Sequence, residues 1–123
     1  MALDLFVGIP VSDYRRALGW YERLFGEPPS FVPNEIEAVW ELSEHRHVYV
    51  VHAPERAGNA LVVSFVENLG ERVAAISGRG IEPVKRETYE NGVSKVIYED
   101  PEGNEISFGG MGTDQRPGDG EPR

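Results

Sequence analysis

Histidine side chains are the strongest candidates for metal chemistry, and all three of them lie between positions 45 and 52. His45 and His47 are two residues apart, so in an extended strand their imidazoles would point to the same side, about 7 Å apart. His52 has the opposite parity and would point to the other side. Two imidazoles without a third ligand do not make a specific metal site. We therefore interpret the pair as a solvated surface feature next to Glu44 and Arg46.

Other catalytic motifs are absent from the sequence. There is no cysteine, which excludes thiolate nucleophiles, disulfides and cysteine zinc sites. There is also no Ser-x-x-Lys, no Gly-x-Ser-x-Gly and no phosphate-binding loop. Glu105 is a candidate general base if it faces a binding cleft, although a carboxylate beside a turn is more often solvated.

The composition is that of one globular domain. The chain has 123 residues and a mass of 13.7 kDa, with 40% hydrophobic and 27% charged residues. Its net charge is −9, of which residues 110–123 carry −1, because three acids there outnumber two arginines. The remaining −8 disfavours nucleic acid and anionic membranes as partners and mildly favours cationic small molecules. The sequence has no long apolar run and no signal-like N-terminus, so we expect a cytoplasmic protein.

The first half of the chain predicts the element order strand, helix and three strands. Residues 3–11 alternate as a strand, and a serine–aspartate pair then precedes a helical stripe over residues 14–25. Further strands are predicted at residues 30–32, 36–42 and 46–53. Residues 54–59 form the predicted linker, so the first module spans about residues 1–53.

The second half repeats this order. A strand at residues 61–66 precedes a helix that ends near Gly78, and strands follow at residues 84–89, 93–98 and 105–108. Asp100-Pro101-Glu102-Gly103 separates the last two strands and predicts a type I turn. The second module therefore spans about residues 60–109, within a single domain of residues 1–109. Residues 110–123 are poor in apolar side chains and are predicted to be disordered.

Two blocks of residues resemble the vicinal oxygen chelate superfamily, which includes glyoxalase I, extradiol dioxygenases and the fosfomycin- and bleomycin-resistance proteins. The opening block is Ile9-Pro10-Val11-Ser12-Asp13, followed by Ala17, Trp20-Tyr21 and Leu24-Phe25-Gly26. The closing block is the hairpin Asp100-Pro101-Glu102-Gly103-Asn104, and the resemblance covers residues 3–109. It implies an α+β fold in which tandem βαβββ modules form a curved mixed sheet with a central cleft and helices on the convex side.

The resemblance also implies a homodimer, since many members pair and often build the cleft across the interface. We expect pairing here as well, because the strand that carries Val39 and Trp40 is predicted to lie at a sheet edge. Exposed strand edges are usually covered by another chain or element.

Enzymes that this chain resembles hold a divalent metal in the cleft through His, Glu or Gln on the first, fourth, fifth and eighth strands. The matching positions here are Phe6 on the first strand, Leu61 on the fifth and Ser107 on the eighth. On the fourth strand the candidates are Tyr49 and Val51, with His47 one step outward. Phenylalanine and leucine cannot ligate a metal, and a neutral serine is a poor substitute for a carboxylate. We therefore predict that the usual metal site is absent and that no cofactor is bound.

The predicted cleft is lined mainly by apolar and aromatic side chains. By strand alternation the inward positions are Phe6, Gly8, Tyr49, Val51, Leu61, Val63 and Phe65, with Glu105 and Ser107 at the rim and Trp40 and Tyr98 as further candidates. Our interpretation is a metal-free, bleomycin-resistance-like protein that binds a small, largely apolar or aromatic molecule, and its acidity suits a cationic one. One alternative is a lyase or isomerase with an atypical metal site or none. Another is a structural or regulatory subunit whose cleft is filled by its own side chains.

Overall fold

The structure of the protein is a computed structural model that describes residues 3–111. The elements in chain order are β1 (Leu5–Val11), α1 (Tyr14–Phe25), β2 (Phe31–Asn34), β3 (Glu37–Ser43), β4 (Arg46–His52), the short 3₁₀ helix η1 (Pro54–Arg56), β5 (Leu61–Phe65), α2 (Leu69–Gly78), β6 (Lys85–Thr88), β7 (Val93–Glu99) and β8 (Glu105–Met111). This order confirms the two predicted βαβββ modules. β8 continues two residues past the predicted domain end, and the rest of the predicted tail lies outside the described residues.

The strands form two separate four-stranded sheets rather than one continuous sheet. Their orders are β1-β4-β3-β2 and β5-β8-β7-β6, so the second module repeats the topology of the first. In each module the first and last strands pair in parallel, and the other neighbours are antiparallel. β3 lies between β4 and β2, so the prediction that the strand with Val39 and Trp40 is a sheet edge is wrong. The edge strands are β1 and β2 in one sheet and β5 and β6 in the other.

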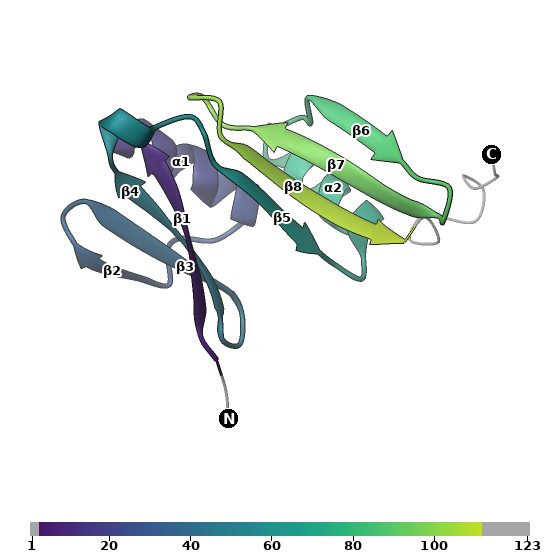
Figure 1. Cartoon of the computed structure of the whole chain (residues 1–123), viewed down its shortest axis with the longest axis horizontal. Helices are drawn as coiled ribbons and strands as arrows, with labels where there is room; N and C mark the ends of the chain where they lie inside the picture. The colour runs from purple at the N-terminus through teal and green to yellow at the C-terminus, as the bar shows by residue number, and fades with distance from the viewer. Residues whose placement is uncertain (1–2, 112–123) are drawn as a thin grey trace.

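Both helices lie behind the sheets in the view of Figure 1. The helix-covered faces meet in one hydrophobic core that includes Ile9, Val50, Ile106 and Phe108. The opposite faces of the two sheets carry no helix, and we call these two surfaces together the open face. None of the helices within residues 3–111 is long and apolar enough to cross a membrane.

Trp40 and Tyr98 belong to the core, which corrects their assignment to the cleft. Trp40 is fully buried, contacts Tyr21 and Phe25, and donates a hydrogen bond of 2.9 Å from Nε1 to the Glu27 carbonyl. Tyr98 is also fully buried and packs edge-on against Phe108. The physical reason is register: each lies directly opposite a buried residue of the neighbouring strand, and directly paired residues share one face of a sheet.

The hairpin turn between β7 and β8 ties the second module to the first. The Asp100 carboxylate accepts a hydrogen bond of 2.7 Å from the Tyr21 hydroxyl of α1. The Asn104 side chain donates to the Pro10 carbonyl at 2.9 Å and accepts from the Ala60 N–H at 2.8 Å. Burial, followed by the charge and the hydrogen bond of Asp100, raises the pKa of Tyr21 far above its usual range, so its hydroxyl stays a donor.

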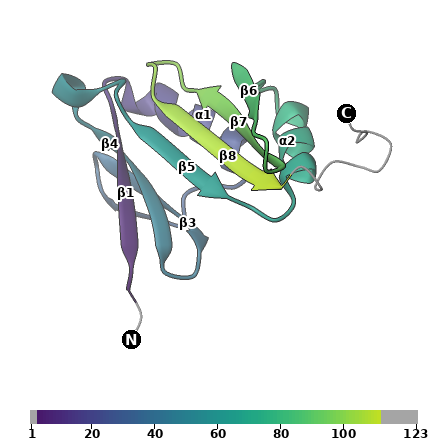
Figure 2. The same ribbon diagram turned by 45° about the vertical axis from the view of Figure 1, so that its right-hand side comes forward.

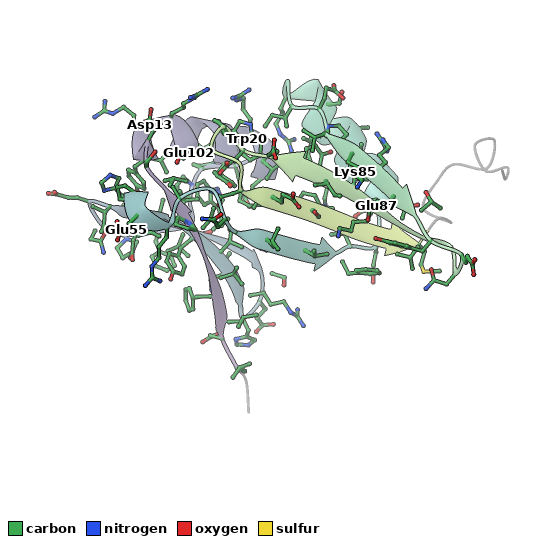
Figure 3. All side chains as sticks on the ribbon, turned by 45° about the horizontal axis from the view of Figure 1, so that its top comes forward. Asp13, Trp20, Glu55, Lys85, Glu87 and Glu102 are labelled. Carbon is green, nitrogen blue, oxygen red and sulfur yellow. The ribbon has the colours of Figure 1, made fainter. Side chains whose placement is uncertain are left out.

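Glu102 of the same turn caps the start of α1. Its carboxylate accepts hydrogen bonds from the Ser12 N–H at 2.7 Å, the Ser12 hydroxyl at 2.9 Å and the Asp13 N–H at 2.7 Å. Figure 3 shows Glu102 and Asp13 next to each other at this junction. Backbone N–H groups that precede a helix attract a negative charge, so this contact stabilises α1 from the other module. The opening block with Ser12-Asp13 and the closing block with Glu102, which were noted in the sequence, therefore contact each other in the folded chain.

Replacing Glu102 with glutamine is expected to remove a pH-dependent part of the stability. Burial alone would raise the pKa of Glu102, but the hydrogen bonds from Asp13 and Ser12, with the nearby Arg16 charge, outweigh it and hold the pKa below its ordinary value. A carboxyl with a lowered folded pKa contributes stability above its unfolded pKa and loses it as the pH falls through the folded pKa. We expect Glu102→Gln to cost about 1–2 kcal/mol at neutral pH.

The measurement is urea unfolding of wild type and Glu102→Gln between pH 7 and about pH 3. The difference between the two proteins should be largest at neutral pH and shrink below about pH 4.5. Glu90→Gln, at an exposed turn position, is the matched control and should follow wild type throughout. A constant difference across the whole range would contradict the charge-dependent role of Glu102.

Candidate functional site

The structure places all of the predicted cleft residues except Trp40 and Tyr98 on the open face. From sheet β1-β4-β3-β2 they are Phe6, Gly8, Tyr49 and Val51, and from sheet β5-β8-β7-β6 they are Leu61, Val63, Phe65, Glu105 and Ser107. Ser107 is buried at the base of this face rather than at its rim, because Val63 and Ile97 flank it on the neighbouring strands. Glu105 is half-buried.

Several large apolar side chains of the open face are exposed in the single chain. The exposed fraction is 77% for Leu61, 66% for Phe65 and 47% for Phe6. Side chains that plug a cleft or form a core would be removed from water. Within one chain these residues therefore neither plug the open face nor belong to the core, and they leave an apolar surface that solvent reaches.

An aromatic ring lies across a glycine on the open face of each module. A Cβ at Gly8 of β1 would stand 2.7 Å from the tip of the Tyr49 ring on β4, its direct partner in the register. A Cβ at Gly109 of β8 would stand 2.8 Å from the Phe65 ring on β5, again its direct partner. The two modules thus place a ring at equivalent strand pairs, with the glycine on the first strand in one module and on the last strand in the other. Only glycine leaves room for a side chain to lie this close to the sheet.

Phe6 adds a third ring at the start of β1. It stacks on His47 of β4 with ring centroids 4.2 Å apart and an interplanar angle of 7°. Because Phe6 and His47 are direct partners in the parallel β1–β4 pair, the stack lies on the open face next to the Tyr49 ring. The face therefore presents flat aromatic surface, the geometry that planar molecules stack on.

The predicted pairing of His45 and His47 on one strand face is wrong. His45 lies in the turn before β4 with a φ of 70°, so strand alternation does not apply to it. Its ring contacts Asp4 at 2.7 Å and Glu44 at 3.3 Å, all on the protein surface. His47 instead stacks on Phe6. No group of three or more His, Cys, Asp or Glu within residues 3–111 is arranged to hold a metal ion.

The four positions that match the metal ligands of the enzymes that this sequence resembles do not carry a fitting set of donor atoms. Phe6 on β1 and Leu61 on β5 carry no ligating atom, and Ser107 on β8 is neutral. On β4 the candidates are a tyrosine and a valine, and the neighbouring His47 is engaged in the ring stack. This set offers no combination of nitrogen and carboxylate oxygen donors that would bind a divalent ion.

The end of the open face near the β7–β8 turn is acidic. Glu105 of β8 and Glu99 of β7 are direct partners in the antiparallel register, so their carboxylates lie on the same face. Like charges at such positions repel each other, and a cation between them would relieve the repulsion. Sequence alternation indicated Glu105 but not Glu99, because only the register places them side by side.

The fold is shared with proteins of several activities. The chain is 49% identical to the glyoxalase/bleomycin resistance protein from Catenulispora acidiphila DSM 44928, with a TM-score of 0.87 over 89% of this chain and 99% of that chain. A bleomycin-binding protein complexed with bleomycin is 17% identical, with a TM-score of 0.70 over 87% of this chain and 97% of that one. A lactoylglutathione lyase from Agrobacterium tumefaciens is 14% identical, with a TM-score of 0.69 over 89% and 94%.

The family comparison agrees with the structural one. No curated protein matches this chain at a significant level. The sequence model described as "Glyoxalase/Bleomycin resistance protein/Dioxygenase superfamily" matches residues 3–108, which is nearly all of the part that the structure describes. This chain belongs to the glyoxalase/bleomycin resistance protein/dioxygenase superfamily.

Proposed function

We propose that this protein binds a small, planar and largely apolar or aromatic molecule on its open face, without a metal ion. The observation that carries the proposal is the pair of rings, Tyr49 over Gly8 and Phe65 over Gly109, that lie against the two sheets. The Phe6–His47 stack extends this surface. The adjacent Glu99 and Glu105 favour a ligand that carries a positive charge at one end.

The proposal includes pairing of two copies of this chain. A single chain leaves Phe6, Leu61 and Phe65 exposed, and a second copy that covers the open face would enclose a ligand between the two. The bleomycin-binding protein with the same fold has a ligand in its structure, which supports a binding role for this fold. A cytoplasmic location remains part of the proposal, to be tested by cell fractionation.

Replacing Tyr49 or Phe65 with alanine is expected to weaken binding of a planar aromatic cation such as proflavine. Each substitution removes a ring on which the ligand would stack, and we expect this to weaken the binding free energy by about 1–3 kcal/mol. Replacing a core phenylalanine with alanine costs about 3–5 kcal/mol of folding stability. Phe65→Ala should cost much less, because Phe65 is exposed. Fluorescence titration and thermal melts of the same preparations provide both numbers.

Tyr14→Ala is the control, because Tyr14 is also a partly exposed tyrosine but belongs to α1, which lies on the helix-covered side of the sheets and not on the open face (Figure 1). It should bind proflavine as wild type does. Failure of the wild type to bind proflavine, or equal losses of affinity in all three variants, would contradict the proposal.

Two further measurements on wild type test the absence of a metal and the pairing of two chains. Stoichiometric divalent metal in elemental analysis would favour the lyase or isomerase alternative. A mass near 13.7 kDa in light scattering at tens of micromolar would exclude the dimer.

A further inference from the structure

A groove runs between the two modules, away from the acidic end of the open face. Its cavity volume is about 790 Å³, and its walls come from the starts of β1 and β4 on one side and from β5, β8 and α2 on the other. Figure 2 shows that β1 and β5, which both contribute residues to the groove, diverge from each other. Three phenyl rings line it: Phe25, Phe65 and Phe108. A cavity of this size accommodates a small organic molecule.

Arg72 of α2 lies in this groove without an acceptor for its buried nitrogen. The guanidinium carbon is 5.3 Å from the centroid of the Phe108 ring. Its Nε is buried and makes no hydrogen bond with any residue that the structure describes. Within residues 3–111 no carboxylate forms an ion pair with Arg72. Arg72 is half-buried, and a carboxylate would supply the acceptor that its buried Nε lacks, because the fork of N–H donors matches the two carboxylate oxygens.

The charge balance of the groove is opposite to that of the protein. Arg46 and Arg72 line it together with a single acid, Glu27, whereas the whole chain carries −9. An anion is therefore attracted to this groove and repelled from the acidic end of the open face. The three phenyl rings favour an aromatic body over a flexible chain, because they offer ring surface on both walls.

We propose that the groove between the modules binds an aromatic carboxylate, with its carboxylate on Arg72 and its ring among Phe25, Phe65 and Phe108. This site goes beyond the open face in location and prefers the opposite ligand charge. Tyr49 and Gly8 do not line the groove, whereas His47, Val63 and Phe65 border both surfaces.

The test is calorimetric titration of the full chain with 2-naphthoate at neutral pH. Wild type should bind it, and Arg72→Met, which keeps an apolar stem over Phe108 but has no charge, should bind at least tenfold more weakly. The matched control is Arg15→Met, an exposed position on α1, which should bind as wild type does. The uncharged analogue 2-naphthol should bind wild type and Arg72→Met equally and more weakly than 2-naphthoate binds wild type.

Unchanged naphthoate affinity in Arg72→Met, or 2-naphthol binding as tightly as naphthoate, would overturn the proposal. Arg72→Lys keeps a positive charge without the fork and should lie between wild type and Arg72→Met; circular dichroism checks that each variant is folded. Tyr49→Ala separates the two sites, because it should weaken proflavine binding and leave naphthoate binding unchanged. A wild type that binds 2-naphthoate but not proflavine would count against the open face and not against the groove.

Discussion

Replacing Asp100 with alanine is expected to lower the free energy of unfolding by about 3–5 kcal/mol. The Asp100 carboxylate is buried and accepts four hydrogen bonds, from the Tyr21 hydroxyl at 2.7 Å, the Asn104 side chain at 2.9 Å, and the N–H groups of Glu102 at 2.8 Å and Asn104 at 3.0 Å. Alanine leaves all four donors without this acceptor. The Tyr21 hydroxyl and the Asn104 amide lie in fully buried residues, so water does not readily replace the carboxylate there.

Chemical denaturation of wild type and variants measures this loss. Asp4→Ala is the matched control, because Asp4 is an exposed aspartate whose partner is a surface histidine, and its loss should change stability little. Tyr21→Phe removes one donor and leaves the other three, so it should cost less than Asp100→Ala. The double variant should cost less than the sum of the two single variants, because both changes break the same hydrogen bond. If Asp100→Ala proves as mild as Asp4→Ala, this buried network does not join the modules.

The sequence predicted those features of the fold that depend on neighbours in the chain. The helix over residues 14–25 is confirmed because its start, apolar stripe and terminating Gly26 are local signals, and Gly26 adopts a φ of 82° as a helix-ending glycine does. The turn at Asp100 is confirmed for the same reason, and its Gly103 N–H donates to the Asp100 carbonyl at 3.1 Å. The repeated order of elements then indicated the two modules.

The features that were missed depend on which face of a strand meets a helix. β4 is apolar on both faces, with Val48 and Val50 buried and Tyr49 and Val51 on the open face, so alternation alone does not decide between them. Alternation placed Trp40 on the apolar face of its strand, but without the register it did not decide whether that face belongs to the core or to the cleft. When both faces of a sheet are apolar and only one is covered by helices, the alternation pattern of a strand does not distinguish buried from exposed aromatic residues.

The sequence did not show which residues of the two modules contact each other. Glu102 reads as a turn residue, and only the folded chain shows that it binds Ser12, ninety positions earlier. Arg72 reads as a solvated helix residue, although its guanidinium lies over Phe108 in the groove between the modules. The groove depends on how the two half-domains are placed, which is long-range information, whereas strand alternation already indicated most residues of the open face.

Replacing Gly58 with alanine is expected to destabilise the protein by about 3 kcal/mol or more, well beyond the cost of its backbone conformation. Gly58 has a φ of 89°, which costs a residue with a Cβ about 1–2 kcal/mol. In addition, a Cβ there would lie 2.6 Å from the Glu102 carbonyl oxygen, so the linker and the hairpin turn would have to separate. That movement would pull the Glu102 carboxylate away from Ser12 and Asp13 at the start of α1.

Gly92→Ala is the matched control for the cost of placing a residue with a Cβ at a positive φ. It also has a φ of 89°, but the nearest atom to its Cβ position is the Met111 methyl at 3.8 Å, which is ordinary contact. Gly92→Ala should therefore cost about 1–2 kcal/mol, and the difference between the two variants isolates the clash with the turn. Gly58→Ala should also lose most of the stability difference between neutral and acidic pH that depends on Glu102, whereas Gly92→Ala should keep it. Equal stabilities and equal pH profiles of the two variants would show that the linker does not hold the turn against α1.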